Sequence, residues 1–210
     1  MEGYTTEEEQ IENIKRWWSQ HGKSILIGLI LGLAVLAGVR YWNDQKGTQA
    51  EQASVLYEQM MVALEQNNKK AVLDQGAALI GQYPKTPYGA LAAFALAKVK
   101  LEEGDAKSAR TYLQWVLDNA KQPGLEHIAR LRLARVSLSE NQTDAALKLL
   151  DVADAGVFSA EYEELKGDIH AATGKTEQAR VAYTKAQGLA KEGADQRTLQ
   201  MKLDDLGAAS

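Results

Sequence analysis

Histidine is the residue type of this 210-residue chain best suited to bind a metal or to exchange a proton near neutral pH. His127 and His170 each stand alone within a helical pattern, with no His or Cys at the spacing that metal ligands need. His21 lies beside a long apolar segment. The chain has no cysteine, which excludes disulfides, thiol nucleophiles and thiolate metal sites. The pattern therefore predicts no metal site and no cofactor.

Other common parts of an active site are also missing from the pattern. The carboxylate pairs Glu102–Glu103 and Asp204–Asp205 have the setting of solvated surface residues. The glycines of "GLILG", residues 28–32, stand inside an apolar run and not in a phosphate-binding loop. The net charge is −4 and the Lys and Arg residues are dispersed, which argues against nucleic acid as a partner. We expect a protein that is not an enzyme.

The most distinctive stretch is "SILIGLILGLAVLAGVRYW", residues 24–42. Its first part, residues 24–39, contains no charged side chain. As a helix the whole stretch spans about 28 Å, close to the ~30 Å hydrocarbon thickness of a bilayer. Aromatic residues frame it on both sides, as at the two interfaces of a membrane: Trp17, Trp18, Tyr41 and Trp42. This framing predicts one transmembrane helix.

Two other interpretations of the run remain open. Residues 35–37, Val-Leu-Ala, satisfy the small-residue rule of a signal-peptide cleavage site. The segment before the run, residues 1–23, carries five Glu, however, unlike the short basic region of a signal peptide. The second alternative, a buried core helix, is usually shorter and interrupted by polar positions. We therefore favour a retained anchor in the lipid bilayer.

Positive charges on the two sides of the run indicate its orientation. Lys15, Arg16 and Lys23 precede it, whereas Arg40 and Lys46 follow it, and this slight bias favours a cytoplasmic N-terminus. We predict a single-pass inner-membrane protein. Its predicted parts are a cytoplasmic segment, a transmembrane helix and a periplasmic domain: residues 1–23, 24–42 and 43–210.

The N-terminal segment has a helical pattern of its own. Thr6 and Glu9 have the spacing of a capping box, and Ile11, Ile14 and Trp18 follow at helical intervals. This pattern predicts a short amphipathic helix on the inner membrane surface. The alternative is a frayed tail that only positions the nearby basic residues.

Two glycines within the predicted anchor have the spacing that lets membrane helices approach closely. Gly28 and Gly32 form a G-x-x-x-G pattern. Glycine is common in membrane helices, so the pattern alone leaves a specific helix partner open. No ionisable residue lies in residues 24–39, which argues against an ion path.

The rest of the chain carries a helical repeat. From residue 48 on, Ala and Leu recur every three or four residues, and no stretch alternates long enough for a sheet. Three segments share one pattern: "LAKVKLEEGDAKSARTYLQWVL", "LARVSLSENQTDAALKLLDVA", which runs to Ala153, and "KGDIHAATGKTEQARVAYTKA". The small residue of the first helix moves from Ala97 to Ala134 to Gly167, steps of 37 and 33 residues. These steps are near the ~34-residue tetratricopeptide period.

Local signals mark the turns and the ends of this array. We expect a left-handed backbone between the two helices of each unit, at Gly104, Asn141 and Gly174. A degenerate unit over residues 49–65 and 69–82 precedes the break at "YPKTPYG", and residues 195–206 form a closing helix. The fold class is therefore all-α: a single N-terminal transmembrane helix followed by a tetratricopeptide-like α-solenoid.

A solenoid of helix pairs offers a concave surface for protein partners. Counting from the small residues predicts which first-helix positions face that surface: Phe94, Lys98, Leu101, Leu131, Arg135, Leu138, Glu164, Asp168 and Ala171. We expect Lys98 and Arg135 to meet an acidic group of a partner, with Phe94 supplying apolar contact. The alternative is that these are ordinary solvated helix charges.

Three segments together carry a resemblance to a known family: "KRWWSQHGKSILIGLILGLAVLAGVRYW", "PYGALAAFALA" and "LRLARVSLSENQTDAALKLLD". In this order they closely resemble the YfgM family, the ancillary subunits of the bacterial SecYEG translocon. The likeness covers nearly the whole chain, and the first segment is the most specific. The resemblance carries over no catalytic residue.

The resemblance implies a function that the spacing alone does not. It implies an inner-membrane adaptor that associates with SecYEG and with the membrane-anchored chaperone PpiD, and that helps pass newly exported proteins to periplasmic chaperones. It also implies an influence on envelope stress signalling through the cytoplasmic segment. The alternative is an envelope scaffold protein that self-associates and has no translocon role.

Overall fold

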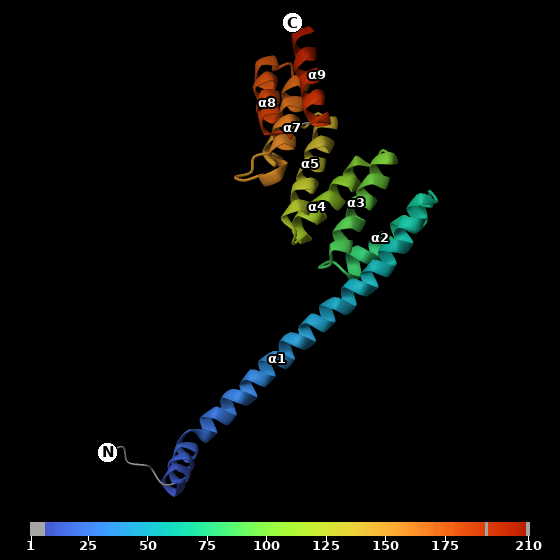
Figure 1. Ribbon diagram of the computed structural model, residues 1–210. Coiled ribbons are helices and arrows are strands. Elements are labelled where there is room, and N and C mark those ends of the chain that lie inside the picture. Colours follow the sequence, from blue (N-terminus) through green and yellow to red (C-terminus); the bar gives the residue numbers. More distant parts are fainter. Residues whose placement is uncertain (1–6, 192, 209–210) are drawn as a thin grey trace, which may run out of the picture. The chain divides into compact units, whose positions relative to one another are not determined.

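The computed structural model describes residues 7–191 and 193–208, and within these residues it contains helices and no strand (Figure 1). The predicted all-α fold is therefore confirmed. The α-helices are α1 Glu7–Glu65, α2 Lys69–Gln82, α3 Pro87–Glu102, α4 Ala106–Asn119, α5 Pro123–Ser139, α6 Thr143–Leu149, α7 Ser159–Ala172, α8 Thr176–Leu189 and α9 Ala194–Ala208. A 3-10 helix, η1 Gly156–Phe158, precedes α7.

The first helix is longer than the sequence pattern predicts. The pattern predicts separate helices over 6–18, 24–42 and 49–65, whereas α1 runs without a break from Glu7 to Glu65. The connecting stretch "NDQKGT" contains no proline, so every residue in it can donate its backbone N–H to the helix. The predicted capping box involves Thr6 and the side chain of Glu9, which lie outside the described part of the structure.

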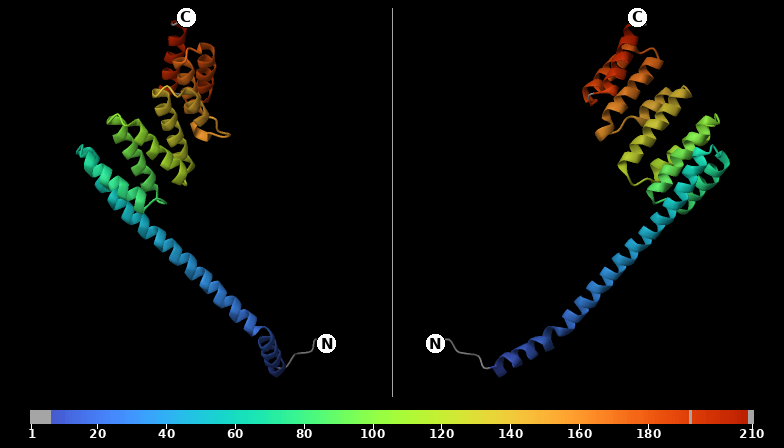
Figure 2. Two further views of the ribbon diagram at one scale, coloured as in Figure 1. Left: turned by 180° about the vertical axis from the view of Figure 1, so that it is seen from behind. Right: turned by 45° about the vertical axis from the view of Figure 1, so that its right-hand side comes forward.

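The chain forms two compact units, residues 1–49 and residues 50–210. The first unit holds the N-terminal part of α1. In the second, successive helices pack as antiparallel pairs: the C-terminal part of α1 with α2, then α3 with α4, α5 with α6, and α7 with α8, with α9 against α8 (Figure 2). The domain boundary that the sequence places at residue 43 stays a prediction.

The turns within the helix pairs have the predicted geometry. Gly104, Asn141 and Gly174 all lie in the left-handed region, with φ of 78°, 59° and 72°. This conformation costs Gly little free energy and is tolerated by Asn, which explains why these residues stand there. Asn67, with φ of 53°, makes the same turn between α1 and α2, and the sequence analysis missed it.

Small residues allow the paired helices to approach, as the repeat predicts. Ala97 is buried in one core with Ala109 and Leu113, and the other two units repeat this contact. Gly167 lies directly under the ring of Tyr183, so that an added Cβ would overlap ring atoms. Gly76 does the same under Leu96 and was not identified from the sequence. The period therefore reflects close packing between the helices.

One helix is shorter than the repeat predicts. The pattern extends to Ala153, but α6 ends at Leu149, and Ala153 is exposed in the following loop. Beyond Leu150, which is still buried, Asp and Gly favour a turn over a helix. The Asp154 carboxylate accepts a hydrogen bond of 2.8 Å from the backbone N–H of Gly156. This local bond competes with continued helix formation and starts the turn into η1.

Candidate functional site

The predicted anchor is an exposed apolar helix. The large apolar side chains of residues 25–39 are 41–67 % exposed, so nothing in the structure covers them. Among the described residues, one helix, within α1, is long and apolar enough to cross a membrane. A soluble monomer rarely leaves so much contiguous apolar surface in water, because its hydration is unfavourable. The geometry is that of a helix that needs a lipid or protein environment.

Aromatic residues stand at both ends of this apolar surface. Trp17, Trp18, Tyr41 and Trp42 are each more than half exposed, as residues at a headgroup layer are. The His21 ring stacks on Trp17 at a centroid distance of 5.5 Å, and its Nδ1 lies 3.1 Å from the Trp17 backbone oxygen. Both of these contacts join His21 to a residue of its own helix.

The two glycines of the predicted anchor present open backbone. A Cβ added at Gly28 or Gly32 would meet no atom within 4 Å. The helix surface at these two glycines is therefore accessible to another helix, although no described residue packs against it there. Helix packing at Gly28 and Gly32 stays a prediction.

Two apolar members of the predicted partner surface are buried in the structure. Phe94 is 7 % exposed and Leu131 is 5 % exposed, and both pack in the cores of the helix array. The Arg132 guanidinium carbon lies 4.6 Å above the Phe94 ring centroid and covers its remaining face. We therefore no longer assign Phe94 or Leu131 to a partner contact.

The basic members of that surface do reach solvent. The Lys98 side chain is 64 % exposed and lies 3.9 Å from Glu102, a weak surface ion pair. Leu101 and Arg135 are also exposed. Burial, together with the nearby charge of Arg135, lowers the pKa of Arg132. Arg132 and Arg135 thus form a positive spot on α5 that an anionic group would stabilise.

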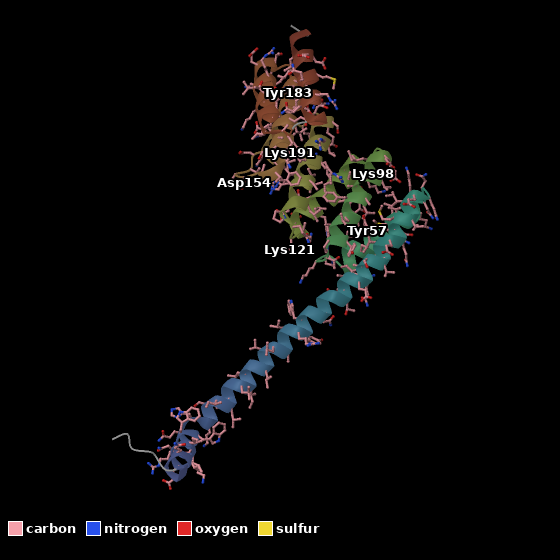
Figure 3. All side chains as sticks on the ribbon, in the orientation of Figure 1. Tyr57, Lys98, Lys121, Asp154, Tyr183 and Lys191 are labelled. Carbon is pink, nitrogen blue, oxygen red and sulfur yellow. The ribbon has the colours of Figure 1, made fainter. Side chains whose placement is uncertain are left out.

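The acidic members are already engaged by the closing helix. Lys202 of α9 lies 2.7 Å from Glu164 and 2.6 Å from Asp168, and the Tyr183 hydroxyl donates to Asp168 at 2.8 Å. Burial disfavours the charged form of Lys202, but the hydrogen bonds to Asp168 and Glu164 outweigh it and raise its pKa. Burial, followed by the bond to Asp168, raises the pKa of Tyr183. Glu164 and Asp168 therefore attach the last helix to the array (Figure 3 labels Tyr183).

The remaining histidines have structural surroundings. His127 Nδ1 lies 2.9 Å from the Tyr162 hydroxyl, and its ring stacks on Phe158. Burial lowers the pKa of His170. Within residues 7–191 and 193–208, no group of three His, Cys, Asp or Glu side chains is close enough to hold a metal ion.

A groove that the sequence analysis missed lies between α4 and α6, with α5 at its base. It has a volume of about 1100 Å³ and is called the α4–α6 groove below. Trp115, Leu133 and Leu149 supply apolar lining, and four basic residues surround them: Lys107, Arg110, Arg130 and Lys148. Arg130, Leu133 and Ser137 have the 3 and 4 spacing of one face of α5. That spacing was a signal in the sequence, but only the packing of α4 and α6 makes it a groove.

Comparison with known proteins identifies relatives over nearly the full length. The model of a tetratricopeptide repeat-like domain family matches residues 15–208. A protein of Escherichia coli (strain K12) called "Ancillary SecYEG translocon subunit" is 32% identical over 98% of this chain and 99% of its own. Proteins of the same name from Haemophilus influenzae and Neisseria gonorrhoeae are 32% and 26% identical, over 97% and 98% of this chain and 99% and 100% of their own.

The solved structures show a likeness of fold. MamA from Desulfovibrio magneticus RS-1, in a form that begins at residue 41, superposes with a TM-score of 0.55 at 17% identity. The match covers 76% of this chain and 96% of that chain. At this identity the likeness concerns the arrangement of the helices alone.

Proposed function

This chain belongs to the family of ancillary SecYEG translocon subunits, the YfgM family, and we propose that it is a membrane-anchored adaptor of the translocon. It passes newly exported proteins to periplasmic chaperones and acts without catalysis. The observation that carries the proposal is the exposed apolar segment of α1 in the same chain as a tetratricopeptide-like array. One part suits a bilayer, and the other suits protein partners.

The proposed mechanism is proximity. Residues 43–49 connect the predicted membrane span to the compact unit that begins at Ala50. Even fully extended, a chain of this length spans only about 25 Å. The array therefore stays near the membrane surface, where tethering raises the effective concentration of weak partners such as PpiD, periplasmic chaperones and emerging chains.

We further propose a single-pass arrangement in the inner membrane with the N-terminus in the cytoplasm. The bias of Lys15, Arg16 and Lys23 over Arg40 and Lys46 supports it. In this orientation residues 43–210 face the periplasm. The cytoplasmic segment would then be the part available for an influence on envelope stress signalling.

Lys98 on α3 and the positive spot on α5 are the proposed contact for an acidic group of a partner. Lys98 and Arg135 are exposed, and burial, followed by the nearby charge of Arg135, lowers the pKa of Arg132. An Arg135→Glu variant should capture less partner, because it replaces attraction by repulsion. Unchanged capture would remove this contact from the proposal while leaving the adaptor role untouched.

Co-purification from gently solubilised membranes tests the adaptor role. The full chain is compared with a variant whose residues 24–39 are replaced by an unrelated membrane helix. If translocon subunits co-purify with both chains, the array recognises the translocon. If they are lost when residues 24–39 are replaced, the anchor recognises it. If neither chain retains a translocon subunit or a chaperone, and crosslinks join only identical chains, the self-associating scaffold is correct and the adaptor is not.

A further inference from the structure

We propose that the α4–α6 groove binds an acidic segment of another polypeptide. The groove lies between the second helices of two neighbouring units, whereas the surface predicted from the sequence lies on the first helices α3, α5 and α7. The proposal does not depend on the translocon role. It rests on charge, on apolar lining and on one buried hydroxyl.

Unpaired positive charge is the first observation. Of the four basic residues in the groove, Arg110 is bound within the chain, to Glu140 at 2.7 Å and to Gln142 at 2.5 Å. The other acidic residue of the lining, Asp118, accepts a hydrogen bond from Gln114 at 2.9 Å. Lys107, Arg130 and Lys148 have no ion pair with any residue that the structure describes. Three cations from three helices therefore line the groove without an ion pair, and its four basic and two acidic residues leave a net charge of +2, although Asp118 has no ion pair among the described residues either.

The buried hydroxyl is the second, independent observation. Ser137 lines the groove from α5, is 0 % exposed, and its Oγ has no hydrogen-bond partner within the described chain. A buried polar group without a partner is unfavourable, and native structures rarely keep one. Because Ser137 is 0 % exposed, a ligand that brings an oxygen or an N–H into the groove would satisfy its Oγ once the side chains that cover it move aside.

Size and lining favour a polypeptide over a small anion. The volume of about 1100 Å³ is slightly above the ~300–1,000 Å³ range of pockets that hold small molecules. The cations come from both walls and the base, so one phosphate or one carboxylate would leave most of them unpaired. The half-buried side chains of Trp115 and Leu149 offer apolar contact between the charges, above the buried Leu133. A segment that alternates acidic and apolar residues matches both features.

The test measures binding of a short fluorescein-labelled peptide with the repeat Glu-Ala-Glu-Phe to the full chain in nanodiscs of neutral lipid. Fluorescence anisotropy gives the affinity, and the same peptide with Gln in place of Glu is the ligand control. We expect the acidic peptide to bind at least tenfold more tightly, with an affinity that falls as salt screens the charges. Equal affinity for the two peptides, or no binding of either, overturns the proposal.

Two matched variants locate the site. Lys107→Glu combined with Lys148→Glu reverses two groove charges, and Lys85→Glu combined with Lys191→Glu makes the same change of net charge at exposed positions outside the groove (Figure 3 labels Lys191). We expect the first pair to weaken binding at least tenfold and the second to change it less than twofold. Loss on the second pair alone would place the peptide outside the groove and overturn the proposal.

A third variant tests the hydroxyl without changing charge. Ser137→Ala removes the only unpartnered atom of the side chain and should fold as well as the parent chain, since the hydroxyl makes no bond there. We expect a loss of affinity of about threefold to tenfold, the range for one net hydrogen bond. Unchanged affinity would show that Ser137 takes no part.

Binding of anionic lipid vesicles tests the alternative that the groove recognises a membrane. If the chain binds such vesicles, and if reversing the charges of Lys107 and Lys148 abolishes vesicle binding but not peptide binding, the ligand is a membrane and the proposal is overturned.

Discussion

Replacing Gly167 by Ala tests whether close helix approach holds the last repeat together. A Cβ at this position overlaps the Cδ1 and Cε1 atoms of Tyr183 and lies 3.0 Å from its Cγ. The ring cannot easily move aside, because Tyr183 is 3 % exposed, its hydroxyl donates to Asp168, and Lys202 lies 5.5 Å from its ring centroid. Helices α7 and α8 must therefore separate to admit the methyl group.

The expected magnitude is the difference of two effects. Overpacking of a rigid core costs about 1–3 kcal/mol, and the rigid ring places this site at the upper end. Ala is favoured over Gly within a helix by about 1 kcal/mol, which offsets part of that cost. The net loss is about 2 kcal/mol, equivalent to a melting temperature lower by about 4–8 °C for a domain of this size.

Thermal unfolding of the full chain in detergent, followed by far-UV circular dichroism, measures this loss. Gly188→Ala in α8 is the matched control, since its added Cβ meets nothing within 4 Å, and we expect it to stabilise by up to about 1 kcal/mol. In a Tyr183→Leu background, Gly167→Ala should cost much less, because the ring that it strikes is gone. If Gly167→Ala raises the melting temperature as the control does, the close approach of α7 and α8 is not what holds this repeat.

Four further predictions concern other parts of the molecule. The pKa of Lys202 and that of Tyr183 are both raised above the ordinary values of 10.5 and 10.0. While Asp168 and Glu164 are ionised, the stability that these shifts contribute is therefore complete near neutral pH and is lost as pH rises above the ordinary values and through the raised ones. Lys202→Met with Tyr183→Phe should flatten this loss in melts taken across that alkaline range. Leu113→Ala should destabilise the array by about 2–5 kcal/mol in urea unfolding, because Leu113 is 0 % exposed, and a cost below about 1 kcal/mol would contradict its place in the core. Gly104→Ala should cost about 1 kcal/mol in the same assay, because φ of 78° strains any residue with a Cβ. Leu31→Lys should raise the free energy of membrane insertion by about 3 kcal/mol and so shift protein from the pellet to the supernatant in carbonate extraction. An unchanged pellet fraction would argue against a membrane span.

Features that depend on neighbouring residues were predictable from the sequence. The helical period, the turns at Gly104, Asn141 and Gly174, the break before Pro87 and the closing helix all match the structure. Each depends on a local property, such as the freedom of Gly at positive φ or the missing N–H of Pro. The separate helices predicted before residue 65 were wrong, because no local signal forces a helix to stop between them.

The partner surface was predicted less well, because helical periodicity gives the face on which a residue lies but not which other residues pack over that face. Counting from Ala97 and Ala134 assigned Phe94 and Leu131 to the concave surface that faces partners, but both are buried in the array. The same counting left Glu164 free, whereas Lys202 binds it from 38 residues away in the sequence. No periodicity within one helix contains that information.

The sequence by itself therefore determined the kinds of parts in this protein: an exposed apolar helix, a run of helix pairs with close contacts, and a closing helix. Only the tertiary structure decided which charges stay available, with Glu164 and Asp168 used to attach α9 while Lys107, Arg130 and Lys148 remain unpaired among the described residues. The physical reason is that helix formation depends on local backbone preferences, whereas burial and ion pairing depend on side chains brought together from distant parts of the chain.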